Sequence, residues 1–241
     1  MSNAIFEQFI SDLSQWNIKP TDYQLSQFAR YYDMIVETNE VMNLTAITEF
    51  SEVMKKHFLD SLSLSRETDL TDKVYSVIDI GTGAGFPGIP LKIMFPNLRV
   101  TLLDSLNKRV GFLNRVIEEL ELTDIEAVHG RAEDFAKNKT YREQYNYCVS
   151  RAVANLSTLS ELCLPFVKVG GYFVPYKSEK SNEEIPAAEH ALHILGGKIT
   201  KVDSFELPDS DLHRDLIYIS KVASTPGKYP RKAGTPAKEP L

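Results

Sequence analysis

A short apolar segment that leads directly into a glycine-rich loop constrains the fold of this chain more than any other feature. Residues 74–80 are mostly apolar, as in a strand that is buried on both faces of a parallel sheet. Gly81, Gly83 and Gly85 follow at alternate positions. Glycines there let the backbone turn sharply and approach a bound ligand closely. We therefore expect a ligand at the end of this strand.

Strand-like and helical segments alternate after the loop. An amphipathic helix is predicted over residues 107–120, and the strand-like runs are residues 100–104, 125–128, 147–150, 171–175, 198–205 and 216–222. The last two runs have no helix between them and predict an antiparallel hairpin. The pattern predicts an α/β fold of the Rossmann-like kind, with a doubly wound, mainly parallel sheet.

The two ends of the chain differ from this central region. Residues 1–65 show apolar positions at helical spacing and predict an N-terminal helical cap on a domain that spans residues 66–222. Residues 223–241 contain four prolines and predict an extended tail that packs poorly on its own. The net charge is −6, yet residues 221–241 hold five basic residues and one acidic one. Whole-chain charge therefore hides a basic tail.

No apolar run approaches the roughly 20 residues that a membrane-spanning helix needs, and the N-terminus lacks the pattern of a signal peptide. The two cysteines have no CxxC spacing. We therefore expect a cytoplasmic protein that is not bound to a membrane.

Two carboxylates next to the loop favour one class of ligand. Asp79 lies two positions before the first glycine, where it suits the ammonium of S-adenosylmethionine and would repel the pyrophosphate of a dinucleotide. Pro87 removes an amide that an anion would use. Asp104 ends the second strand and suits the two ribose hydroxyls, although NAD sites place an acid similarly. An NAD-dependent oxidoreductase and a plain structural turn remain alternatives.

Two further strand ends carry polar residues. Ala132 and Glu133 follow the third predicted strand, where the adenine would lie, although acidic residues in a first helical turn also stabilise a helix by themselves. Arg151 ends the fourth strand, at the carboxyl edge where open α/β sheets bind ligands. Its guanidinium suits the methionine carboxylate or a substrate phosphate, and the sequence does not choose between them.

Several motifs in a fixed order give the chain a resemblance that covers nearly its whole length. It resembles the bacterial guanine-N7 methyltransferases of small-subunit ribosomal RNA, also called glucose-inhibited division protein B. The segments that carry the resemblance are residues 43–46, 57–62, 79–88, 104–109, 130–133, 150–152, 213–214 and 229–236.

The resemblance implies a class I methyltransferase fold, S-adenosylmethionine as methyl donor with no metal, and a guanine near the decoding region of 16S ribosomal RNA as target. The substrate would be the RNA or the 30S subunit. The cofactor contacts implied by the resemblance or by the loop are Asp79, Gly81, Gly83, Phe86, Asp104, Ser105, Leu106, Ala132, Glu133 and Arg151. A methyltransferase acting on a small molecule is the alternative.

Four residues are candidates for the target side of the site. Asn43 and Thr45 can hydrogen-bond a guanine edge or merely cap a helix. His57 can serve catalysis or be a partly buried structural side chain, and Lys177 can contact phosphate or be solvated. Guanine N7 has an in-plane lone pair, so the reaction needs alignment and no dedicated base.

The RNA contacts are expected on basic residues. Lys228, Tyr229 and their neighbours can track a phosphate backbone and stack on a base, or form an ordinary disordered end. The predicted RNA-binding residues are Lys108, Arg109, Arg214, Lys228, Arg231 and Lys232. We expect a monomer whose tail can be removed without effect on cofactor binding.

Overall fold

The computed structural model describes residues 3–178 and 181–241. Its strands form one sheet in the order β3-β2-β1-β4-β5-β7-β6. They are β1 (Ser76–Ile80), β2 (Arg99–Asp104), β3 (Ile125–His129), β4 (Tyr145–Arg151), β5 (Val167–Lys177), β6 (Gly197–Glu206) and β7 (His213–Lys221). The first five strands pair in parallel, and β7 pairs antiparallel with both β5 and β6. The predicted fold class, with its closing hairpin, is confirmed.

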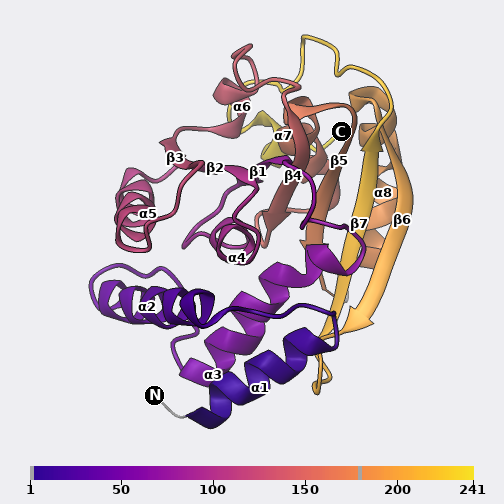
Figure 1. The fold of residues 1–241 in the computed structure, drawn as a ribbon. Helices are drawn as coiled ribbons and strands as arrows, with labels where there is room; N and C mark the ends of the chain where they lie inside the picture. Colours follow the sequence, from indigo (N-terminus) through magenta and orange to yellow (C-terminus); the bar gives the residue numbers. More distant parts are fainter. Residues whose placement is uncertain (1–2, 179–180) are drawn as a thin grey trace.

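Helices cover both faces of the sheet (Figure 1). They are α1 (Asn3–Ser14), α2 (Asp22–Asn39), α3 (Phe50–Val53), α4 (Gly88–Met94), α5 (Asn107–Glu119), α6 (Ala132–Phe135), α7 (Leu156–Cys163), α8 (Ser181–Leu195) and α9 (Thr235–Lys238), with a π-helix η1 (Met54–Leu59) and two 3₁₀ helices η2 (Leu62–Arg66) and η3 (Leu164–Phe166). Within the described ranges, none of them is long and apolar enough to cross a membrane.

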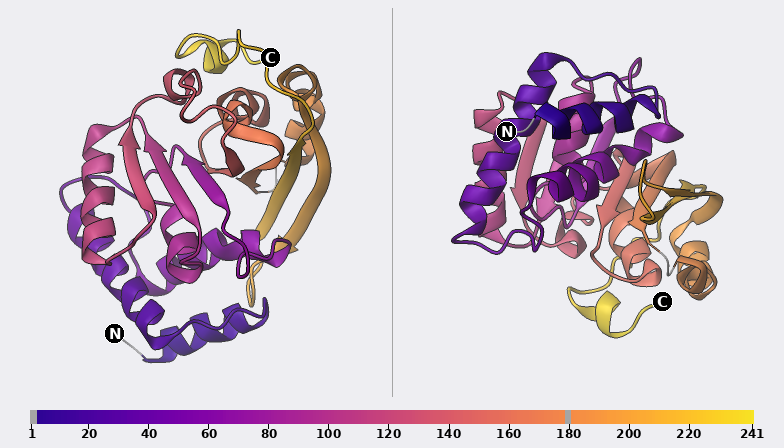
Figure 2. Two further views of the ribbon diagram at one scale, coloured as in Figure 1. Left: turned by 45° about the horizontal axis from the view of Figure 1, so that its top comes forward. Right: turned by 90° about the horizontal axis from the view of Figure 1, so that it is seen from below.

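The molecule has two apolar cores, one on each face of the sheet. The first contains residues of α1, α2, η1, α4 and α5, so the N-terminal helices share a core with the sheet. The second contains residues of α7, α8 and the C-terminal segment. Figure 2 shows the N-terminal helices and the C-terminal segment on opposite sides of the strands.

Side chains of α2 fix the N-terminal helices to the glycine loop and its surroundings. The helix begins at a capping box between Thr21 and Gln24, which satisfies amides that the first turn leaves free. The Gln24 amide also donates to the carbonyl of Ile93 at 2.8 Å. Farther along, the Tyr31 hydroxyl donates to the carbonyl of Ala84 inside the glycine loop. The helical cap therefore helps to shape the predicted ligand site.

The C-terminal segment differs from the expected loosely packed tail. Residues 225–239, which we call the C-terminal strap, lie over α7 and include the short helix α9. Arg142 donates from its guanidinium to the carbonyls of Thr225 and Tyr229 at 2.7 and 2.9 Å. The Tyr229 ring is buried, so the expectation that it stacks on a base was wrong. Partners far away in the sequence hold this segment, and its own composition gave no sign of them.

Candidate active site

The carboxyl ends of β1 and β2 meet at the glycine loop. Gly83 has a φ of +63°, and among the described residues no atom other than those of Gly83 and its two chain neighbours lies within 4 Å of the place where a Cβ would stand. Its amide donates to Oδ2 of Asp104 at 2.9 Å, while Oδ1 accepts from the amide of Leu106 at 2.9 Å. Asp104 therefore ties the two loops together. Each of its oxygens retains a lone pair for a ligand hydroxyl.

Asp79 lies buried beneath the loop with half of its carboxylate unsatisfied. Its Oδ2 accepts from the Thr82 hydroxyl at 2.7 Å and from the Gly88 amide at 2.9 Å. Its Oδ1 has no hydrogen-bond partner among the described residues. Burial raises the pKa of Asp79 to about 6, because the charged form loses its hydration. A buried acceptor without a donor is costly, and it leaves a negative charge directly beneath the glycine loop.

The predicted adenine side lies next to Asp104. The Gly130 amide donates to the carbonyl of Asp104 at 3.0 Å, which places the start of α6 beside the second loop. Ala132 and Glu133 begin α6 and are both buried. Leu106 is 52% exposed at the same edge, and Ser105 is exposed beside it. The structure thus brings these predicted cofactor residues to one edge of the sheet.

Arg151 leaves the end of β4 and meets a residue of the N-terminal cap. Its Nη1 donates to Oδ2 of Asp60 at 2.8 Å, and Arg214 donates from Nε to Oδ1 of the same carboxylate at 2.9 Å. Two guanidinium groups therefore share one carboxylate and leave an excess of one positive charge. The Arg151 guanidinium also lies 5.0 Å from the centre of the Phe86 ring, a cation–π contact.

His57 packs against the same aromatic ring. Its imidazole stacks on Phe86 at 4.6 Å between ring centres, and its Nε2 lies 2.8 Å from the Thr45 hydroxyl. Burial, together with the positive charge of Arg151, lowers the pKa of His57 to about 4. The imidazole is therefore neutral near pH 7. The predicted residues His57, Thr45, Phe86 and Arg151 lie together, although they come from distant parts of the chain.

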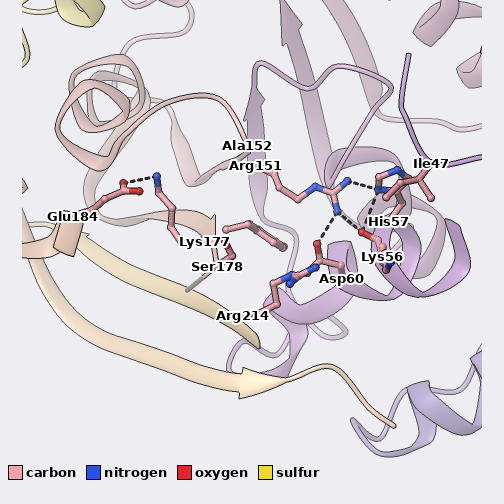
Figure 3. A pocket seen from close by; sticks show the side chains of 11 residues that line it. Ile47, Lys56, His57, Asp60, Arg151, Ala152, Lys177, Ser178, Glu184 and Arg214 are labelled. Atoms are coloured by element: carbon pink, nitrogen blue, oxygen red, sulfur yellow. Dashed lines mark hydrogen bonds and ion pairs between the residues drawn. The ribbon is translucent and has the colours of Figure 1, made fainter. Parts of the chain in front are cut away.

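A cavity of about 550 Å³ opens beside this cluster (Figure 3). Lys177 lies across it from Arg151 and donates to Glu184 at 2.7 Å and to the carbonyl of Ala154 at 2.8 Å. Four basic and two acidic residues line the cavity: Lys56, Arg151, Lys177, Arg214, Asp60 and Glu184. The lining is therefore positive, in contrast to the net charge of the whole chain.

Other predicted residues lie outside the cavity. Asn43 is exposed, and its side chain makes no hydrogen bond within the described part of the chain. Lys108 is exposed at the start of α5, and Arg109 lies 3.6 Å from Asp104. Lys228 and Lys232 are exposed on the strap. Arg231 differs from expectation, because its guanidinium binds the buried carboxylate of Glu161 and is not free for phosphate.

Two residues that sequence reasoning did not single out shape the site. Asp60 holds Arg151 and Arg214 together, and Asn39 accepts from the amides of Leu44 and Thr45 at 2.8 and 3.0 Å. The only signal for Asp60 was its place in the segment 57–62, three residues after His57. Within the described ranges, no group of His, Cys, Asp and Glu side chains is arranged to hold a metal ion.

Comparison with known sequences gives a consistent result. The profile of the family described as "GidB: rRNA small subunit methyltransferase G" matches residues 24–213. Proteins called ribosomal RNA small subunit methyltransferase G are similar over nearly the whole chain. The one from Lachnoclostridium phytofermentans is 54% identical and aligned over 97% of this chain and 96% of its own. The one from Staphylococcus saprophyticus is 54% identical over 95% of both chains.

Solved structures support the fold at low sequence identity. An S-adenosylmethionine-dependent methyltransferase from Aquifex aeolicus superposes with a TM-score of 0.53, at 18% identity, over 72% of this chain and 94% of its own. A protein described as an O-methyltransferase from Agrobacterium tumefaciens reaches 0.55 at 17% identity, over 70% and 82%. With the profile match and the relatives above 50% identity, these findings show that the chain belongs to the rRNA small subunit methyltransferase G family.

Proposed function

We propose that the protein transfers the methyl group of S-adenosylmethionine to N7 of a guanine in 16S ribosomal RNA, near the decoding region of the small subunit. Membership of a family of small-subunit rRNA methyltransferases supports the reaction class. The observation that carries the proposal is the positively lined cavity, which opens directly beside the predicted cofactor residues Phe86 and Arg151.

The residues at the sheet edge fit the proposed cofactor. The unsatisfied Oδ1 of Asp79 suits the ammonium of its amino-acid part, and Asp104 suits the ribose hydroxyls. Open space at Gly83 leaves room for the ligand to cross the loop. When bound, S-adenosylmethionine supplies an electrophilic methyl group on a sulfonium ion.

The target side of the site suits a nucleophile that needs no base. His57 is neutral and hydrogen-bonded to the Thr45 hydroxyl, and the Asp60 carboxylate accepts hydrogen bonds from two guanidinium groups. Neither side chain is therefore a free proton acceptor. Methylation at N7 makes the base cationic. Because the pKa of His57 is low, its imidazole adds no further positive charge beside Arg151 on the Phe86 side of the cavity, which limits electrostatic repulsion of this product.

The partner is then a polyanion that approaches from the cavity side. Arg214 and Lys177 lie at the cavity and can meet phosphate groups, although each already has one carboxylate partner. We further propose that the protein acts as a monomer, because one chain supplies both sides of the cavity. We propose that it is located in the cytoplasm, where ribosomal subunits are found.

The test is methyl transfer from labelled S-adenosylmethionine to undermethylated 30S subunits, naked 16S RNA and a metabolite extract. We expect label in the RNA, released as 7-methylguanosine on nuclease digestion. The variant Asp104→Ala serves as a control for dependence on the cofactor site. Label only in metabolites would support the small-molecule alternative and reject the proposal.

A further inference from the structure

The C-terminal strap contacts two of the helices that begin at the cofactor edge of the sheet, α6 and α7. The Gly234 amide donates to Oε1 of Glu133 at 3.0 Å, at the start of α6. The Thr158 hydroxyl, in the first turn of α7, donates to the carbonyl of Pro236 at 3.0 Å. The loop that leads from Arg151 into α7 lies directly before this turn. The strap therefore touches the adenine side of the site and the helix that follows Arg151.

One ion pair anchors the strap. Glu161 on α7 is fully buried, and Arg231 reaches it with Nη2 at 2.6 Å and with Nε at 3.0 and 3.1 Å. The backbone amide of Arg231 donates to the same carboxylate at 2.7 Å. A buried carboxylate needs such a partner, and a forked, charge-assisted pair has a narrow geometry. The pair therefore fixes the path of the chain three residues before Gly234.

The left-handed turn at Gly234 then aims its amide at Glu133. Its φ is +83°, and this residue precedes the first turn of α9. A second contact of Arg231, from Nη2 to the carbonyl of Glu239 at 2.7 Å, closes the strap around α9. Glu133 is buried, and its carboxylate receives its strap contact from a segment that Arg231 holds in place.

We propose that Arg231 is a positioning residue of the cofactor site, acting through Gly234 and Glu133, and that the strap completes the adenine side of that site. This inference rests on the proposed function, because it takes Glu133 as part of the cofactor site. It changes the role of the tail: removal of the strap weakens cofactor binding even when no RNA is present.

The test measures the affinity of the full-length protein for S-adenosylhomocysteine by calorimetry without RNA. Arg231→Ala should weaken binding about tenfold, within the usual range of coupling between separate sites. Lys232→Ala removes the same charge from the neighbouring exposed position and should leave the affinity unchanged. Arg231→Lys keeps the charge but loses the fork, so it should restore part of the affinity.

A double-mutant cycle separates positioning from general stability. In a Glu133→Ala background, Arg231→Ala should cause little further loss, because the contact through which it acts is already gone. If Arg231→Ala does not fold, the pair Arg231→Gln with Glu161→Gln avoids an unpaired buried charge and takes its place. An equal loss in both backgrounds, or wild-type affinity in a folded Arg231 variant, would overturn the inference. If the wild-type protein itself binds no S-adenosylhomocysteine, the proposed function fails instead.

Discussion

Replacing Asp79 by Asn tests whether a buried negative charge destabilises the ligand-free protein and strengthens binding of the cofactor. The carboxylate is fully buried, and its Oδ1 has no donor among the described residues. Asn has nearly the same shape and can still accept from Thr82 and Gly88. We expect Asp79→Asn to stabilise the ligand-free protein at pH 8 and to weaken binding of S-adenosylhomocysteine.

The magnitude follows from the pKa of Asp79, which rises from 3.8 to about 6 on folding. About two units correspond to about 3 kcal/mol. The folded state binds the Asp79 proton more tightly than the unfolded state does. The resulting gain in the free energy of unfolding is complete below pH 3.8 and is lost as the pH rises through 6. From pH 4.5 to pH 8, the free energy of unfolding of the wild-type protein should therefore fall by about 2 kcal/mol relative to that of the variant. The unpaired amide of Asn costs about 1 kcal/mol at both pH values.

Urea unfolding at the two pH values measures this difference. Comparison with the variant cancels other titrating groups, such as His57, which changes stability in the opposite direction. Calorimetry should show a tenfold to hundredfold weaker complex for the variant, about the loss of one charged hydrogen bond. If the free energy of unfolding changes by the same amount between the two pH values in both proteins, the reasoning about the buried charge is refuted. Unchanged ligand affinity would refute the assignment of Asp79 to the ammonium.

Three further results are expected. Asp104→Ala should lose about 1–3 kcal/mol of affinity for S-adenosylhomocysteine by calorimetry, and full affinity would remove Asp104 from the ribose site. At saturating cofactor, the titration of His57 should add no inflection to the pH profile of kcat between pH 5.5 and pH 8, because its pKa is about 4; an inflection near 6.5 that disappears in His57→Gln would contradict this. Lys232→Ala should weaken RNA binding at low salt. It should also lower the slope of the logarithm of the binding constant against the logarithm of salt concentration by somewhat less than one, whereas an unchanged slope in filter binding would exclude a phosphate contact at this residue.

The mainly parallel sheet and its closing hairpin were predictable because each strand carries a local signal. The apolar runs ending at Ile80 and Asp104, and the glycines after the first of them, are contiguous in the sequence. Parallel strands place their carboxyl ends at one edge, so residues after each strand come together without knowledge of side-chain contacts. For this reason Asp79, Asp104, Glu133 and Arg151 could be assigned to one edge from the sequence.

Residues whose role depends on distant partners were not predictable in the same way. Asp60 is an ordinary acidic residue in a helical segment until Arg151 and Arg214, more than 90 positions away, converge on it. The interpretation of Arg231 as an RNA contact failed for the same reason, because Glu161 lies 70 positions away. Local composition specifies that the tail is basic and rich in proline, but it contains no information about the carboxylate that binds it.

Burial determines which cations can face RNA, and here it separates two groups within one short segment. Of the basic residues after position 220, Lys221 is buried and Arg231 is paired with Glu161, whereas Lys228, Lys232 and Lys238 are exposed. The buried pair holds the strap, and the exposed lysines then lie on a segment whose path is fixed. A fixed path lowers the entropy that a basic tail would lose on binding RNA. We therefore propose that the same ion pair supports the cofactor site and orients the exposed lysines, so that one short segment serves both ligands.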